Sequence, residues 1–211
     1  LAEQIRMGLV PQNTKLTPRP KNIPAWNSLS KKKQNEMDAI MSTYAGMIDR
    51  VDQNIGKIVL HLEQTEELEN TIIFFLSDNG GEAETGPLGQ FQFKNLGIYG
   101  KGGNKYGKGW ASLSNTPFRE YKHFAHQGGI QTPLIVHWPK VIPSGNTNRI
   151  LSQFGYLPDL VETCLEVARA KRPQKKNGKT VPIGDGISFV KALQGSKAPL
   201  HTNPIFIEHE G

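Results

Sequence analysis

Residues 70–81 read Asn70-Thr-Ile-Ile-Phe-Phe-Leu-Ser-Asp-Asn-Gly-Gly81, and this stretch decides the fold class. The apolar run from Thr71 to Leu76 is rich in β-branched and aromatic side chains, which is typical of a strand buried on both faces. Such strands lie in the middle of mostly parallel sheets that helices cover. The polar residues that follow fall at the carboxyl end of the strand, where open α/β sheets bind their ligands.

A long amphipathic helix is predicted before this strand. Ser30 is a suitable N-cap, and the helix is expected to end near Gln64. Its apolar residues recur at spacings of three and four and form a stripe about seven turns long, which we expect to face the core. A helix followed by a buried strand is half of a doubly wound unit, so we predict an α/β fold. The stripe consists of Met37, Ile40, Met41, Tyr44, Ile48, Val51, Ile55, Ile58, Val59 and Leu62.

The remainder of the chain alternates between loops and short elements. Residues 80–120 are rich in glycine and lack periodicity, so we predict a long functional loop there. Residues 133–138 form a second short apolar run and are predicted to be a strand. A helix is predicted over 155–170 and a last short strand over 205–207.

The composition is that of a folded protein that does not bind nucleic acid. The 211 residues are 36% hydrophobic and 21% charged, with a formal net charge of +6. The basic residues are scattered and have no interleaved aromatic platform, which argues against a nucleic-acid partner. No apolar run approaches the roughly 18 residues that a membrane span needs. The single cysteine, Cys164, lies in an apolar run, and we expect a buried, inert thiol.

Two adjacent residues just past the first predicted strand are candidate metal ligands. Asp78 and Asn79 supply a carboxylate and an amide oxygen, the donors that hard cations such as Ca²⁺ or Mg²⁺ prefer. Taken alone, the sequence Asp-Asn-Gly-Gly favours a simple chain reversal, because Asx residues and glycines are typical of turns.

Lys122 is a candidate anion-binding residue, because it precedes the second predicted strand and lysine can hold a tetrahedral anion as a point charge. A single lysine is by default an exposed loop residue. His123 and His126 nearby lack the spacing of a metal-binding histidine motif, which favours surface or packing roles.

The combination of these motifs resembles the sulfatase family. Residues 70–81 are similar to its metal-binding strand. Gly109-Trp-Ala, Ser114-Asn-Thr-Pro-Phe-Arg119, Tyr121-Lys122 and residues 128–139 are similar, in this order, to its second signature. Bacterial-type arylsulfatases carry both signatures in the same order. Two weaker similarities lie at 44–52 and at 185–189.

The resemblance implies a fold and a chemistry. The fold is an alkaline-phosphatase-like α/β sandwich with a central, mostly parallel sheet flanked by helices, which this chain carries only in part. The activity is hydrolysis of sulfuric esters by a formylglycine, made in the family from a Cys or Ser in a C/S-x-P-x-R motif. That motif is absent from the sequence. We therefore expect residues 1–211 to be the C-terminal part of the catalytic domain, without the nucleophile-bearing part and the C-terminal subdomain, and inactive alone.

The resemblance also assigns roles to single residues. Asp78 and Asn79 would be ligands of Ca²⁺, with Mg²⁺ as the alternative, and Asp78 would accept the proton of the nucleophile. Lys122 would bind a sulfate oxygen and offset charge on the leaving group. The partner would be a sulfated small molecule or glycan, and the family's habit implies a periplasmic or secreted protein.

Two alternatives remain open at the level of sequence. A phosphodiesterase or phosphonate ester hydrolase of the same superfamily would use a similar site, because sulfate and phosphate esters are similar tetrahedral anions. A non-catalytic module that keeps the metal half-site is the other possibility.

Overall fold

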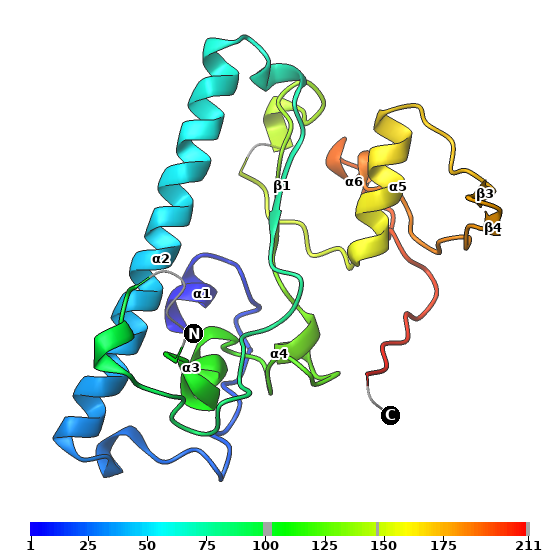
Figure 1. Ribbon diagram of the computed structural model, residues 1–211. Coiled ribbons are helices and arrows are strands. Elements are labelled where there is room, and N and C mark those ends of the chain that lie inside the picture. The colour runs from blue at the N-terminus through cyan, green and yellow to red at the C-terminus, as the bar shows by residue number, and fades with distance from the viewer. Residues whose placement is uncertain (99–102, 147, 210–211) are drawn as a thin grey trace. The chain divides into compact units, whose positions relative to one another are not determined.

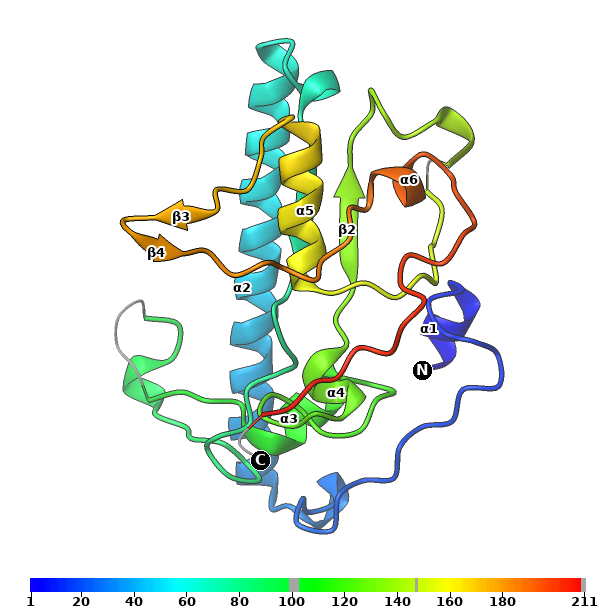
Figure 2. The ribbon, with the colours of Figure 1, turned by 90° about the vertical axis from the view of Figure 1, so that its right-hand side faces the viewer.

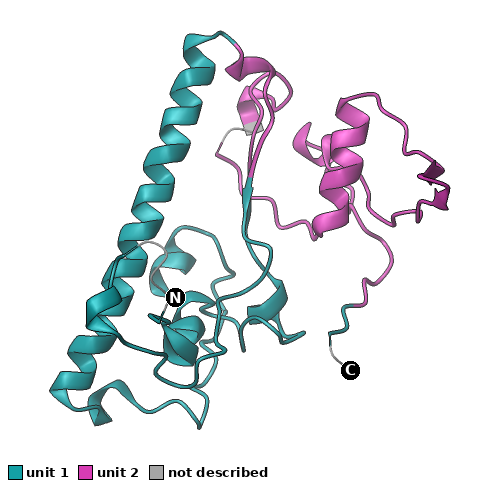
Figure 3. Ribbon diagram, in the orientation of Figure 1, with its two compact units in different colours: residues 1–66, 75–135, 207–211 teal, residues 67–74, 136–206 magenta. Residues whose placement is uncertain are grey.

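The computed structural model describes residues 1–98, 103–146 and 148–209. The chain forms two compact units, which Figure 3 distinguishes by colour. The division between the units falls inside each of two paired strands, so each strand contributes residues to both units. Unit 1 consists of residues 1–66, 75–135 and 207–211, and unit 2 consists of residues 67–74 and 136–206.

Helices and short strands are interspersed along the described chain (Figures 1 and 2). Strand β1 pairs with β2, and β3 pairs with β4 in an antiparallel hairpin. The helices are α1 (Ala2–Arg6), α2 (Lys31–Gln64), α3 (Gly107–Ser114), α4 (Gln127–Ile130), α5 (Leu157–Val167) and α6 (Val190–Leu193). The strands are β1 (Ile73–Leu76), β2 (Leu134–His137), β3 (Lys175–Lys176) and β4 (Lys179–Thr180), and single 3₁₀ turns lie at Trp26–Ser28, Leu68–Asn70, Phe93–Asn95 and Ser144–Asn146.

Helix α2 begins and ends where its sequence predicts. The Lys33 backbone N–H donates to Ser30 Oγ at 3.3 Å, which caps the first turn. The expectation that its whole apolar stripe faces a core is wrong for the described residues. Only Met37 and Ile40 are buried, whereas Ile48 is 51% exposed and Ile58 is 59% exposed. Periodicity shows which face of a helix is apolar, but burial also needs a second element to cover that face.

The partner of the first turns of α2 is α3, which lies beside them in Figure 1. The Trp110 Nε1–H of α3 donates to the Met37 carbonyl at 3.0 Å. The Tyr44 and Tyr106 rings stack with centroids 5.2 Å apart, within the usual range for aromatic pairs. A small cluster of Ala83, Ala111 and Tyr121 packs against Tyr106 and forms the core next to the candidate site.

Strand β1 confirms the prediction of a strand over 71–76. The segment beside it runs in the opposite direction to the parallel neighbour that was expected. Thr132 Oγ1 donates to the Ser77 carbonyl at 2.6 Å, and the Gly80 N–H donates to the Gly129 carbonyl at 2.9 Å. Residues that come later in the segment after β1 face residues that come earlier in the segment before β2, as in an antiparallel pair of strands. The neighbour that the structure describes for β1 is therefore antiparallel, and not the parallel one expected from continuous burial.

Three further expectations are corrected. The 80–120 segment contains the helix α3, which is joined to α2 by the hydrogen bond from Trp110 to the Met37 carbonyl. Residues 99–102 of that segment lie outside the described residues. Residues 205–207 form no strand in the described chain, and Phe206 is 91% exposed. Cys164 is exposed and not buried. It shares a helical face with Leu157 and Val161, which are each 48% exposed, while α5 buries its opposite face.

The buried side of α5 is polar. Asp159 and Thr163 are fully buried. The Asp159 carboxylate accepts from the backbone N–H groups of Tyr156 at 2.9 Å and Ile187 at 2.7 Å, and His201 Nε2 lies 2.8 Å from it. These bonds join the start of α5 to two later segments of unit 2, as buried polar groups require partners.

None of the helices in the described part of the chain combines the length and the apolarity that crossing a bilayer requires.

Candidate active site

The two sequence signatures meet through their glycines. The Gly80 N–H donates to the Gly129 carbonyl at 2.9 Å, and a Cβ atom at Gly80 would lie 1.8 Å from the Gly128 carbonyl oxygen. A Cβ at Gly128 would in turn lie 2.0 Å from the Glu120 carbonyl oxygen. Only glycine allows backbones to approach this closely. The Gly-Gly pairs therefore bring the end of β1 against the loop that carries Lys122.

Lys122 is anchored by its backbone beside the predicted metal ligands. Its N–H donates to the Gly81 carbonyl at 3.1 Å. The Asn115 side chain fixes the same junction: its Oδ1 accepts from the Gly81 N–H at 3.0 Å, and its amide donates to the Glu120 carbonyl at 3.1 Å. Asp78 and Lys122 thus flank one hydrogen-bonded junction within unit 1.

The backbone on either side of Lys122 is unusual. Glu120 has φ of 65° and His123 has φ of 76°, a left-handed conformation that non-glycine residues seldom adopt. Backbone in sparsely populated regions persists where the surroundings fix it, and it gathers at functional sites. The loop is closed by the Gly128 N–H, which donates to the Arg119 carbonyl at 2.8 Å.

Glu84 binds the head group of Lys122. Lys122 Nζ lies 3.2 Å from Glu84 Oε1, and His123 Nε2 lies 2.8 Å from the same oxygen. The hydrogen bond from His123, followed by the hydrogen bond and charge of Lys122, lowers the pKa of the Glu84 carboxyl below its ordinary value. The ionised Glu84 carboxylate therefore accepts from both residues and holds the ammonium at one place.

His123 also reaches the C-terminal residues of unit 1. Its Nδ1 lies 2.9 Å from His209 Nε2, and the two rings stack with centroids 5.2 Å apart. Its Nε2 faces the Glu84 carboxylate and its Nδ1 faces His209, so the imidazole ring of His123 bridges the two residues. His123 is exposed and its ring links Glu84 to His209, which agrees with the predicted surface or packing role.

Asp78 and Asn79 are accessible to a ligand. Asp78 is exposed and Asn79 is half-buried. Among the described residues neither side chain has a hydrogen-bonding or ionic partner, so both oxygens are available for a cation. Carboxylate and amide oxygens fit a hard cation. Within the described residues, no group of three His, Cys, Asp or Glu side chains lies where it could hold a metal ion.

Sequence reasoning missed two residues of this site. Asn115 belongs to the second signature. Its amide side chain can both donate and accept hydrogen bonds, and this property in a loop residue was the signal that could have identified it. Glu84 carried no signal, because a lone glutamate in a glycine-rich loop gives no indication of which cation it will meet.

Comparison with known proteins places these features in a family. The model of the Sulfatase family matches residues 12–170, which include both signatures. The chain is 30% identical over 225 residues to an uncharacterised sulfatase of Schizosaccharomyces pombe, covering 98% of this chain and 39% of that protein.

Two other relatives have more specific names. An arylsulfatase of Klebsiella aerogenes is 32% identical over 150 residues, covering 65% of this chain and 32% of the relative. An N-acetylgalactosamine-6-sulfatase of Canis lupus familiaris is 30% identical over 163 residues, covering 77% and 25%. The chain thus spans less than two fifths of the length of each relative.

The match spans most of the chain and includes the junction at which Gly80, Gly129 and Lys122 meet. It confirms the alkaline-phosphatase-like α/β class, and with it a family whose members use a bound metal and a formylglycine. On the length of the match and on the identity to its relatives, the chain belongs to the sulfatase family.

Proposed function

We propose that the full-length protein containing this chain is a sulfuric ester hydrolase acting on a sulfated small molecule or glycan. One observation carries the proposal. The hydrogen bonds from Gly80 to Gly129 and from Lys122 to Gly81 join two segments within a single unit. One segment carries the side-chain oxygens of Asp78 and Asn79, and the other carries the ammonium of Lys122. Oxygen donors for a hard cation beside a fixed positive charge suit the binding of a tetrahedral anion.

We assign Asp78 and Asn79 as two ligands of a Ca²⁺ ion, with Mg²⁺ as the other cation that this donor set accepts. Both side chains are accessible and without partners among the described residues, which supports the assignment. When bound, such an ion offsets negative charge on the oxygens of the ester. Further ligands would come from residues outside this chain.

Lys122 has the role of an anion-binding residue. Its ammonium would bind a sulfate oxygen and offset the charge that grows on the leaving oxygen as the S–O bond breaks. Asp78 is placed at the same junction and would accept the proton of the attacking hydroxyl. In-line transfer at a tetrahedral anion depends mostly on positioning and charge compensation, which is what these residues supply.

The nucleophile lies elsewhere in the full-length protein. Residues 1–211 contain the segments that resemble the metal-binding strand and the second signature, and no C/S-x-P-x-R motif. We therefore place them in the C-terminal part of the catalytic domain and expect this chain alone to be inactive. Membership of the family also leads us to expect a periplasmic or secreted protein, which fractionation of the source cells would test.

The test compares two substrates of the full-length protein. We expect release of 4-nitrophenol from 4-nitrophenyl sulfate with a kcat/KM well above that for bis(4-nitrophenyl) phosphate. A preference for the diester would identify a phosphodiesterase instead. No turnover of either ester, or of any sulfated sugar, would identify a non-catalytic protein.

A further inference from the structure

The chain returns from unit 2 to unit 1 at residue 207, and one side chain of this segment reaches the candidate active site. His209 Nε2 lies 2.9 Å from His123 Nδ1, and the two rings stack with centroids 5.2 Å apart and 27° between their planes. The two histidines are 86 residues apart in the chain. The pair is therefore a tertiary contact between residues 207–211 and the loop that carries Lys122.

A continuous series of contacts leads from His209 to the ammonium of Lys122. The other ring nitrogen of His123, Nε2, lies 2.8 Å from Glu84 Oε1. The same carboxylate oxygen lies 3.2 Å from Lys122 Nζ. All four residues belong to unit 1. His209 is thus connected, through the side chains of His123 and Glu84, to the charge that we assign to the anion.

The ring of His123 keeps one orientation when both of its nitrogens have partners. The second torsion of a histidine side chain is broad and roughly two-fold, so a ring bound at one nitrogen alone can still turn. His209 is the partner at Nδ1, while Glu84 is the partner at Nε2. A fixed ring fixes the carboxylate, and the carboxylate holds the lysine, because each partner removes rotamer freedom from the next side chain.

The contact between the two rings is a hydrogen bond in which one nitrogen carries the proton and the other offers its lone pair. Which of the two carries it depends on the tautomers. The substitution His209→Gln preserves a partner in both cases, because an amide group both donates and accepts. His209→Phe preserves a flat ring for stacking but has no hydrogen-bonding group.

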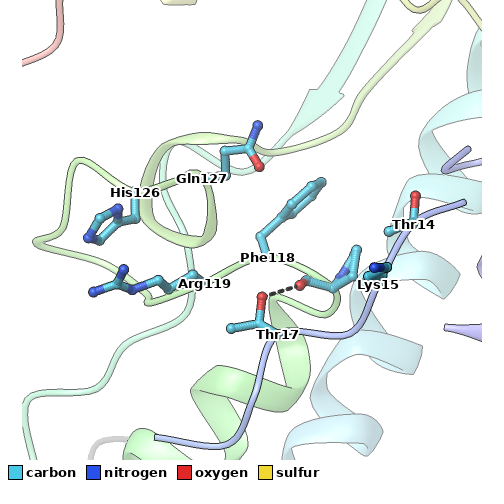
Figure 4. A pocket seen from close by; sticks show the side chains of 8 residues that line it. Thr14, Lys15, Thr17, Phe118, Arg119, His126 and Gln127 are labelled. Carbon is cyan, nitrogen blue, oxygen red and sulfur yellow. Dashed lines mark hydrogen bonds between the residues drawn. The ribbon is translucent and has the colours of Figure 1, made fainter.

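Arg119 and His126, which lie on either side of Lys122 in the chain, line a pocket of about 360 Å³ (Figure 4). Of the residues that the structure describes, neither Lys122 nor His123 lines this pocket. In the described part of the chain the side chain of His126 has no hydrogen bond with a member of the series that begins at His209. His126 is therefore a second exposed histidine of the same loop that does not hold Lys122.

From these contacts we infer that His209 is a positioning residue of the candidate active site, acting on Lys122 through His123 and Glu84. The inference rests on the proposed function, because the ammonium in question is the one assigned to a sulfate oxygen. It makes residues 207–211 part of the unit that prepares the site. A purely structural tether would instead stabilise the fold without changing how the lysine is held.

The first measurement needs no activity. Lys122 of the full-length protein is acetylated with limiting acetic anhydride, and mass spectrometry gives its labelling rate relative to that of Lys94, an exposed lysine. An ammonium paired with a carboxylate is less available to the reagent, so we expect His209→Ala and His209→Phe to raise the Lys122 rate about threefold. His209→Gln and His126→Ala should leave this rate at the wild-type value.

The second measurement is kcat/KM of the full-length protein for 4-nitrophenyl sulfate. We expect His209→Ala and His209→Phe to lower it about fivefold, the effect of one lost hydrogen bond, and His209→Gln to retain at least about half of the wild-type value. In a protein that already carries Glu84→Ala, His209→Ala should change kcat/KM by less than about 1.5-fold, because the connection to Lys122 is already broken.

Two results overturn the inference while hydrolysis of the sulfate ester stands. One is a Lys122 labelling rate that His209→Ala does not change. The other is an equal kinetic effect of His209→Ala with and without Glu84, or rescue by His209→Phe in place of His209→Gln, since a structural tether would give either. The predicted labelling pattern in a protein that hydrolyses no sulfate ester would overturn only the proposed function.

Discussion

Glu84 Oε1 lies 3.2 Å from Lys122 Nζ, although 38 residues separate the two in the chain. Both side chains are partly exposed, so the pair contributes little to stability. Its consequence is positional, because a long, flexible lysine that must meet an anion loses conformational freedom when it binds. A carboxylate that already holds the ammonium reduces that loss.

Replacing Glu84 should impair turnover without unfolding the protein. We expect Glu84→Ala in the full-length enzyme to lower kcat/KM for 4-nitrophenyl sulfate about tenfold, or about 1.4 kcal/mol of transition-state stabilisation. Glu63→Ala, an exposed glutamate of α2, is the control. If steady-state kinetics give both variants a kcat/KM within twofold of the wild-type value, Glu84 is not part of the active site.

The pKa of Glu84 sets the pH range of this anchor. Because the pKa is lowered from its ordinary value of 4.5, the carboxylate is ionised at and above that pH, and the anchor is fully present there. The anchor is lost as pH falls through the lowered pKa. The ratio of wild-type to Glu84→Ala activity should therefore be constant above about pH 5 and fall toward one in more acidic buffer, with a flat ratio as the contrary result.

Gly80 should tolerate no side chain. A Cβ there would lie 1.8 Å from the Gly128 carbonyl oxygen, so we expect Gly80→Ala to destabilise the protein by about 3 kcal/mol. Gly46 in α2 is the matched control, because a Cβ there has no neighbour within 4 Å. Gly46→Ala should stabilise the helix by about 1 kcal/mol. Urea unfolding midpoints that move in the same direction for both variants would contradict the close glycine contact.

Asp159 should be the most sensitive residue of unit 2. Asp159→Ala removes the acceptor of two backbone N–H groups and of His201 from a fully buried place. We expect a loss of about 3–5 kcal/mol, typical of breaking a buried charged network. Glu166→Ala on the exposed side of the same helix should change the unfolding free energy by less than about 0.5 kcal/mol. A similar, small effect of both variants would show that the network is dispensable.

Tyr156 should ionise late. Its hydrogen bond to the Asp185 carboxylate, followed by desolvation, raises the pKa of the phenol to about 12. Because the folded-state pKa exceeds that of the unfolded chain, this contribution to stability is complete below pH 10 and is lost as pH rises toward 12. The difference in phenolate absorbance between wild type and Tyr156→Phe should titrate near the upper value. A difference that titrates near pH 10 would show that Tyr156 does not form this hydrogen bond.

The sequence predicted the positions of helices and strands better than it predicted which elements pack against one another. The cap at Ser30, the end of α2 at Gln64 and the strand before Asp78 all follow from local patterns, and the structure confirms them. The apolar stripe of α2 did not reveal how much of it would be covered, since Ile48 and Ile58 remain exposed. Local pattern determines which face of an element is apolar, whereas burial depends on contacts distant in sequence.

The candidate site shows the same division. Asp78, Asn79 and Lys122 could be selected because two signatures occur in a fixed order, and their assigned roles remain predictions. The antiparallel direction of the strand beside β1 and the Glu84–Lys122 pair depend on long-range contacts that no residue spacing encodes. The loop geometry at His123, with its positive φ, likewise follows from the packing of Gly128 and Gly129.

The most direct test of the account is the rate of sulfate release by the full-length protein when Lys122 or Asp78 is replaced. We predict that Lys122→Ala and Asp78→Ala each lower kcat/KM for 4-nitrophenyl sulfate at least about a hundredfold, as the loss of one group that stabilises transition-state charge does. Lys94→Ala, an exposed lysine outside the site, should leave the rate unchanged. Wild-type rates in both site variants would contradict the proposal that these two residues form the active site.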